Sequence, residues 1–109
     1  MVELLINNKN SIGALCKEHQ VDRLYVFGSA ANGQMKADSD IDLLVQFSKA
    51  VELLDYADNF FSLQFKLQSL LQRKIDLLTV NSVKNEILID AIDRSKIELY
   101  AAETPKVFT

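Results

Sequence analysis

The sequence predicts an α/β (α+β) domain in which a small mixed β-sheet of three to four strands is flanked by helices. Two observations support this prediction. Helical and strand-like hydrophobic patterns alternate in the order α-β-α-β-α-β-α-β, and 49% of the residues are hydrophobic, as in globular proteins. Because 109 residues suit one domain, we expect a single domain over residues 1–102 and a flexible tail over 103–109.

The first half of the chain predicts one helix and two strands. Apolar residues at the spacing i, i+3, i+4 and i+7 between positions 12 and 19 predict an amphipathic helix over residues 3–19. Two short apolar runs predict strands over residues 23–27 and 41–47. Between them we expect one helical turn over residues 29–33 and a polar connection over residues 34–39.

The second half predicts a long helix over residues 55–73, a strand over 74–80, a helix from Ser82 to about residue 94 and a last strand over 97–100. Ser82 is the expected capping residue of the second of these helices. In the long helix, Phe60, Phe61 and Phe65 form an aromatic cluster that we interpret mainly as core, with room for one ring to serve a partner surface.

Composition excludes several classes of protein. The net charge is −3 and the basic residues are scattered, so no basic face predicts direct binding to nucleic acid. No segment approaches the roughly 20 apolar residues of a membrane span, and the N-terminus lacks a secretory pattern. The single cysteine, Cys16, cannot form an internal disulfide and is expected in the core, so we predict a cytoplasmic protein. The single histidine, His19, is expected to be hydrogen-bonded or solvent-facing.

Gly28 and Ser29 follow the first predicted strand and open a helical turn. Glycine allows a ligand to approach the backbone closely, and unpaired N–H groups at a helix start attract phosphate. The Ser29 hydroxyl adds a donor, although it could also only cap the turn.

Asp40 and Asp42 stand at the head of the second predicted strand. Residues i and i+2 share one face of a strand, roughly 6.6 Å apart, so these carboxylates repel unless a cation lies between them. A hard divalent cation such as Mg²⁺ suits them, and Asp76 in the next strand offers a third carboxylate. The alternatives are turn and strand-start aspartates without metal, and an Asp76 that faces solvent from an edge strand.

Gly28-Ser29, ten intervening residues and Asp40-x-Asp42 resemble the signature of the DNA-polymerase-β-like nucleotidyltransferases. Within these, the chain is most similar to the minimal nucleotidyltransferase (MNT) family, over nearly its whole length. The resemblance implies a nucleotidyltransferase fold in which Gly28 and Ser29 bind the triphosphate of ATP. It also implies that Asp40 and Asp42 hold two Mg²⁺ ions, and that Asp76 helps bind the catalytic metal and takes the proton from the attacking hydroxyl.

One position departs from the family pattern. Family members often carry an arginine where this chain has Asn32, so a fixed cation near the triphosphate is missing there. Lys36 could supply the charge, and Ser39 beside the first aspartate could contact the nucleotide or act as a turn hydroxyl.

So short a chain builds a nucleotide site and little more, so the acceptor is expected on another protein. The resemblance implies a HEPN-domain toxin as that partner, in a homo- or hetero-oligomer, with AMP transferred to a tyrosine and the chain acting as antitoxin. The alternative is a catalytically weak or inactive antitoxin that neutralises its partner by binding. Transfer to a small molecule would need an accessory domain.

Overall fold

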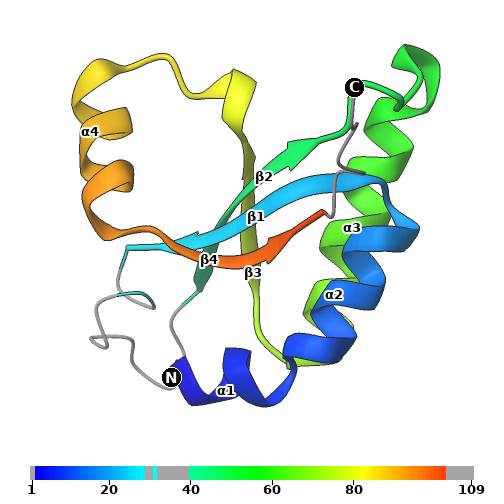
Figure 1. Ribbon diagram of the computed structural model, residues 1–109, viewed down its shortest axis with the longest axis horizontal. Helices are drawn as coiled ribbons and strands as arrows, with labels where there is room; N and C mark the ends of the chain where they lie inside the picture. The colour runs from blue at the N-terminus through cyan, green and yellow to red at the C-terminus, as the bar shows by residue number, and fades with distance from the viewer. Residues whose placement is uncertain (1, 29–30, 32–39, 103–109) are drawn as a thin grey trace, which may run out of the picture.

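A four-stranded mixed sheet organises the chain in the computed structural model, which describes residues 2–28, 31 and 40–102 (Figure 1). The strand order is β3-β2-β1-β4. β1 pairs antiparallel with β2 and β4, whereas β2 and β3 are parallel. The strands are β1 Val21–Phe27, β2 Ile41–Phe47, β3 Ile75–Thr79 and β4 Ile97–Ala101. The predicted mixed α/β architecture is therefore confirmed.

Helices cover both faces of this sheet. Figure 1 shows α2 and α3 together on one side and α4 apart from them. The helices are α1 Val2–Asn7, α2 Lys9–Glu18, α3 Tyr56–Leu71 and α4 Glu86–Ser95, with short 3₁₀ turns at Leu53–Asp55 and Val80–Ser82. None of the helices in the described part of the chain has the length and apolar character needed to cross a membrane.

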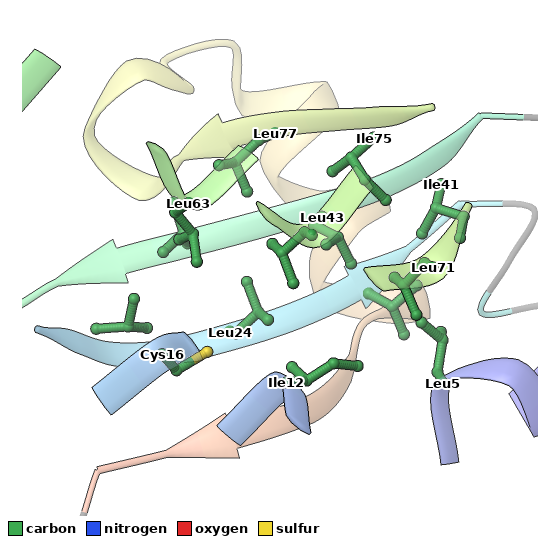
Figure 2. Close-up of a cluster of buried hydrophobic side chains, with 14 residues drawn as sticks. Leu5, Ile12, Cys16, Leu24, Ile41, Leu43, Leu63, Leu71, Ile75 and Leu77 are labelled. Carbon is green, nitrogen blue, oxygen red and sulfur yellow. The ribbon is translucent and has the colours of Figure 1, made fainter. Parts of the chain in front are cut away.

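Strand alternation separates the apolar side chains of the sheet into two clusters, because successive residues of a strand point to opposite faces. The main core lies between the sheet and α1, α2 and α3, and Figure 2 shows its side chains meeting. Its labelled members are Leu5, Ile12, Cys16, Leu24, Ile41, Leu43, Leu63, Leu71, Ile75 and Leu77. A smaller cluster of Phe27, Leu44 and Ile92 holds α4 to the opposite face.

The predicted helix over residues 3–19 is wrong in one respect, because it is divided at Asn8 into α1 and α2. The backbone of Asn8 has φ −107° and ψ 13°, outside the helical range. Its side-chain Nδ2 donates to the carbonyl of Leu4 at 2.8 Å. Asparagine side chains compete with helical hydrogen bonds in this way, which explains the division.

The prediction that Ser82 caps the last helix is wrong. α4 begins at Glu86, and Asn85 is its N-cap, since its Oδ1 accepts from the backbone N–H groups of Ile87 at 2.9 Å and Leu88 at 3.2 Å. Ser82 instead closes the 3₁₀ turn before it, donating its hydroxyl to the carbonyl of Thr79 at 2.8 Å.

α3 buries only one of its two apolar stripes. Leu63, Leu67 and Leu71 face the core, whereas the side chains of Phe61 and Phe65 are 62% and 67% exposed. The prediction that these two rings belong mainly to the core is therefore wrong. They lie outside it because residues at i and i+4 form a stripe of their own on a helix, and the sheet covers only the leucine stripe.

Two glutamines fasten α3 to the outermost strand, β3. Gln64 Nε2 donates to the carbonyl of Ile75 at 3.0 Å, and the N–H of Ile75 donates to Gln68 Oε1 at 3.1 Å. Both backbone groups at the start of the β3 edge therefore have side-chain partners.

His19 is buried and hydrogen-bonded, so the solvent-facing alternative is wrong; only 4% of the residue is exposed. Its Nδ1 donates to the carbonyl of Leu15 at 2.7 Å, and its Nε2 lies 2.9 Å from the hydroxyl of Ser62 in α3. The histidine thus ties the end of α2 to α3. The predicted turn and connection over residues 29–39, apart from Ala31, and the predicted tail over 103–109 lie outside the described residues.

Candidate active site

Asp42 and Asp76 are neighbours on adjacent parallel strands. The register of β2 and β3 pairs Asp42 with Asp76, and adjacent strands lie roughly 4.8 Å apart. Each aspartate is flanked in its own strand by two buried aliphatic residues, so both carboxylates project from the opposite face. The sheet itself, rather than a loop, brings the two acids together.

The environment of Asp42 disfavours its charge. Partial burial is the main cause that raises the pKa of this carboxyl, and the negative charges of Asp76 and Asp40 raise it further. A hydrogen bond to the Asp76 side chain acts in the same direction. A cation between these carboxylates would remove the repulsion.

Asp40 lies just before β2, two residues from Asp42, and close enough for its charge to raise the pKa of Asp42. Its Oδ2 is 3.9 Å from the ammonium of Lys74, and both side chains are largely in water, so this ion pair is weak. The backbone is better fixed, because the N–H of Ile41 donates to the carbonyl of Lys74 at 2.9 Å. The start of β2 is therefore held beside β3, and Asp40 stays near the acid pair.

Gly28 borders the pair on the β1 side, where Phe27 is in register with Asp42. Its φ of +69° lies in the left-handed region that favours glycine, and a Cβ at this position would stand 2.8 Å from Asp42 Oδ2. Glycine is thus required both by the turn and by the carboxylate that lies against its backbone. The close approach of a ligand to Gly28 stays a prediction.

Ser95, at the end of α4, is a neighbour of this turn that sequence reasoning missed. The N–H of Gly28 points to its hydroxyl at a long 3.5 Å, and that hydroxyl donates to the carbonyl of Ala91 at 3.1 Å. The contact joins residues 67 positions apart, so no local pattern could have indicated it.

The remaining predicted site residues, Ser29, Lys36 and Ser39, lie outside the described residues, as does Asn32. Their roles stay predictions.

The order of the described groups across the sheet is Gly28 directly after β1, Asp42 on β2 and Asp76 on β3. Within residues 2–28, 31 and 40–102, no three His, Cys, Asp or Glu side chains are already arranged to hold a metal ion. The donor chemistry nevertheless fits a hard divalent cation, which binds carboxylate oxygens and completes its shell with water and phosphate oxygens. The arrangement can therefore hold a metal–phosphate complex against a backbone turn.

Comparison with known proteins agrees with this geometry. The sequence model of the Polymerase beta, Nucleotidyltransferase family matches residues 10–104. A candidate protein adenylyltransferase of Methanocaldococcus jannaschii is 37% identical over 89 residues, which cover 78% of this chain and 91% of that protein. The solved structure of a candidate minimal nucleotidyltransferase has a TM-score of 0.70 and 34% identity, over 87% of this chain and 92% of that one.

A third similarity is to a complex of a tri-AMPylated Shewanella oneidensis HEPN toxin with an MNT antitoxin. Its TM-score is 0.62 over 90% of this chain and 73% of that one, and at 22% identity it supports the fold alone. Family match, sequence identity and fold agree with the resemblance noted in the sequence. The chain belongs to the polymerase β nucleotidyltransferase family.

Proposed function

We propose that this chain transfers AMP from ATP to a tyrosine hydroxyl of a HEPN-domain toxin and so acts as its antitoxin, with Mg²⁺ as cofactor. The observation that carries the proposal is the register pair of Asp42 and Asp76 beside the left-handed turn at Gly28. The similarity to a protein adenylyltransferase supports AMP as the transferred group. The HEPN acceptor is proposed from the resemblance to the MNT family, whose fold the antitoxin in the complex with an AMPylated HEPN toxin shares.

In the proposed reaction, the acceptor oxygen attacks the α-phosphorus of ATP and the bond to the β-phosphate oxygen breaks, so pyrophosphate leaves. Asp76 takes the hydroxyl proton as general base, a role worth on the order of 10²–10⁴ in rate. The exposed position of Asp76 on the outermost strand leaves its carboxylate accessible to an acceptor. Gly28 and Ser29 cradle the triphosphate.

Asp40, Asp42 and Asp76 would hold the Mg²⁺ ions. When bound, these ions neutralise charge on the phosphates during an in-line displacement. Burial and the nearby negative charges of Asp76 and Asp40, which together raise the pKa of Asp42, support this assignment, because a bound cation offsets both. Lys36 and Ser39 are proposed as further contacts to the nucleotide.

The test is to incubate the chain with Mg²⁺-ATP and a HEPN-domain protein from the same organism, and to weigh both proteins intact. We expect an AMP-sized mass gain on the HEPN protein. The gain should be abolished by Asp42→Ala and slowed about a hundredfold or more by Asp76→Asn. Asp90→Asn, which alters an exposed carboxylate on α4, serves as the control and should leave transfer unchanged.

A second function is favoured by Asn32, which stands where the family often has an arginine. In that case the chain neutralises its partner by binding, with little catalysis. A tight complex that gains no mass in Mg²⁺-ATP would support this function over transfer.

A further inference from the structure

We propose that the acceptor protein docks along the open edge of β3, inserting an apolar side chain into the groove between β3 and α3 and covering Phe61 and Phe65. This inference rests on the proposed function and names the surface that brings the acceptor hydroxyl to Asp76.

The order of groups across the sheet gives the side of approach. Gly28, where the phosphates are proposed to bind, lies on the β1 side of Asp42, and Asp76 lies on the β3 side. In-line displacement requires the attacking and leaving oxygens on opposite sides of the phosphorus. If pyrophosphate leaves toward Gly28, the acceptor must arrive over β3, which is an edge strand.

A groove of about 280 Å³ lies on that side, between the first half of α3 and β3. Ala57, Phe60 and Phe61 form its α3 wall, and Leu77 and Leu78 form its β3 wall. All of its lining side chains are uncharged. Leu78 is two residues beyond Asp76, roughly 7 Å along the strand, so a residue anchored here places its neighbours within reach of the Asp76 carboxylate.

Phe61 and Phe65 continue this apolar surface along α3. They are one helical turn apart and largely exposed. Gln64 and Gln68, which lie on the same side of the helix, bond Ile75 at the β3 edge, so the two rings border that edge. Neighbouring exposed aromatic side chains of this kind mark protein interfaces and often supply much of the binding energy.

The edge of β3 also offers main-chain contacts. The backbone N–H and C=O of Ile75 point outward, as their bonds to the two glutamines demonstrate, so by alternation those of Leu77 point outward too. No described residue forms a hydrogen bond with the outward-pointing N–H or C=O of Leu77. A docked segment could therefore pair with β3 at the groove.

Charge indicates what kind of segment fits. Asp58, which directly follows the groove residue Ala57, stands exposed at the start of α3, which suits an apolar anchor flanked by lysine or arginine. A second copy of this chain is disfavoured, because it carries a net charge of −3 and would present the same acids. The occupant we infer is the acceptor protein's own segment next to its target tyrosine.

The test uses the double variant Phe61→Ala/Phe65→Ala in the full chain with the same HEPN-domain protein. We expect the KM for this acceptor to rise at least about tenfold, with the KM for ATP and the melting temperature unchanged. The affinity of the complex, measured by calorimetry without nucleotide, should fall by a similar factor. Ile87→Ala, which removes an 82% exposed aliphatic side chain from α4, is the matched control and should change neither value.

The outcomes separate this inference from the proposed function. An unchanged acceptor KM and affinity in the double variant would overturn the docking surface while leaving transfer intact. Absence of transfer by the wild-type chain, with binding still weakened by the double variant, would overturn the transferase function and support the surface. Sedimentation of the wild-type chain as a dimer that the double variant converts to monomer would assign the surface to a second copy and overturn the proposal.

Discussion

At the residue scale, Asp42 carries an electrostatic cost that the fold could have avoided. Two acids occupy paired positions on neighbouring strands, and a third lies close enough to affect the same carboxyl. An asparagine would satisfy the backbone geometry without this repulsion. Retaining an unfavourable cluster of negative charge on an otherwise stable sheet is typical of sites whose chemistry requires that charge.

Burial of Asp42 and its repulsion from the neighbouring acids predict how stability depends on pH in the absence of divalent ions. The pKa of Asp42 is higher in the folded protein than its usual value of 3.8, so the unfolded chain loses this proton first as pH rises. Unfolding therefore becomes easier between the two pKa values, and the penalty persists above both. Asp42→Asn should raise the melting temperature by a few degrees at pH 7, and the gain should disappear below about pH 4.

Thermal melts of the two proteins across this pH range, recorded in chelator, provide the measurement. Asp90→Asn removes a charge from an exposed ion pair on α4 and should not reproduce the pattern. A melting temperature of Asp42→Asn equal to or below that of the wild type at pH 7 would contradict the proposed repulsion.

Gly28 and Gly13 form a matched pair for substitution. Gly28→Ala should lower the free energy of unfolding by about 1–3 kcal/mol, because φ is +69° and the new methyl would meet Asp42 Oδ2. Gly13→Ala should be neutral or stabilise the protein by up to about 1 kcal/mol, because Gly13 lies inside helix α2, where alanine is preferred to glycine. The new methyl would lie 3.7 Å from the Tyr100 side chain, an ordinary van der Waals contact. Urea unfolding measures both, and equal effects would refute the role given to Gly28.

At this scale, the sequence predicted what alternation controls. A spacing of two placed Asp40 and Asp42 on one face, and an acid between apolar neighbours placed Asp76 on the corresponding face of β3. The parallel register that joins Asp42 and Asp76 follows from strand pairing, which no local spacing contains. The contact between Ser95 and Gly28 depends on how α4 returns to the sheet, so no sequence pattern contained it.

At the scale of elements, α4 is only weakly anchored to the sheet. Ile92 is its one buried side chain among the described residues, while Ile87 and most of its neighbours face outward. Its N-terminal cap should therefore matter more than usual, because little packing compensates for a lost capping bond.

Asn85→Ala should lower the free energy of unfolding by about 1 kcal/mol, since two N–H groups lose the acceptor that Asn85 provides. Ser82→Ala, which removes an exposed turn hydroxyl, should cost less than about 0.5 kcal/mol. Chemical denaturation followed by circular dichroism compares the two. A larger effect for Ser82 would restore it as the capping residue.

The elements themselves were predicted closely where apolar runs are unambiguous, as for β2, whose bounds match the expected 41–47. The errors arose where one side chain decides the outcome. Asn8 bonds the carbonyl of Leu4 and divides a helix that periodicity alone makes continuous. Periodicity likewise finds apolar stripes on α3 but not which stripe meets the sheet, so Phe61 and Phe65 were assigned mainly to the core.

At the scale of the whole molecule, one face of the sheet packs the main core and the other carries the acidic residues. One face is sealed by α1, α2 and α3 over the main core (Figure 2). The opposite face carries the acids and is covered only in part by the smaller cluster under α4. The charged groups can therefore stay accessible without exposing the main core to water.

Alkylation of Cys16 can serve as a probe of unfolding, because this residue lies in the main core. It is fully buried, and burial raises the pKa of its thiol to about 12, so alkylation should require unfolding. Ligands that bind only the folded state should slow labelling by the factor 1 + [L]/Kd. Labelling with iodoacetamide in mild urea should therefore slow on addition of Mg²⁺-ATP to the wild type but not to Asp42→Ala. Equal slowing in both proteins would mean that nucleotide binding does not depend on the Asp42 carboxylate.

The two glutamines that bond Ile75 have a consequence for how the protein behaves at high concentration. An exposed strand edge invites identical chains to add to it, which is a route to fibres. Here the first residue of the five-residue outermost strand already has both main-chain groups occupied by Gln64 and Gln68. The stretch left for another chain is too short to template a growing sheet, so this side can accept a brief guest segment and still resist polymerisation.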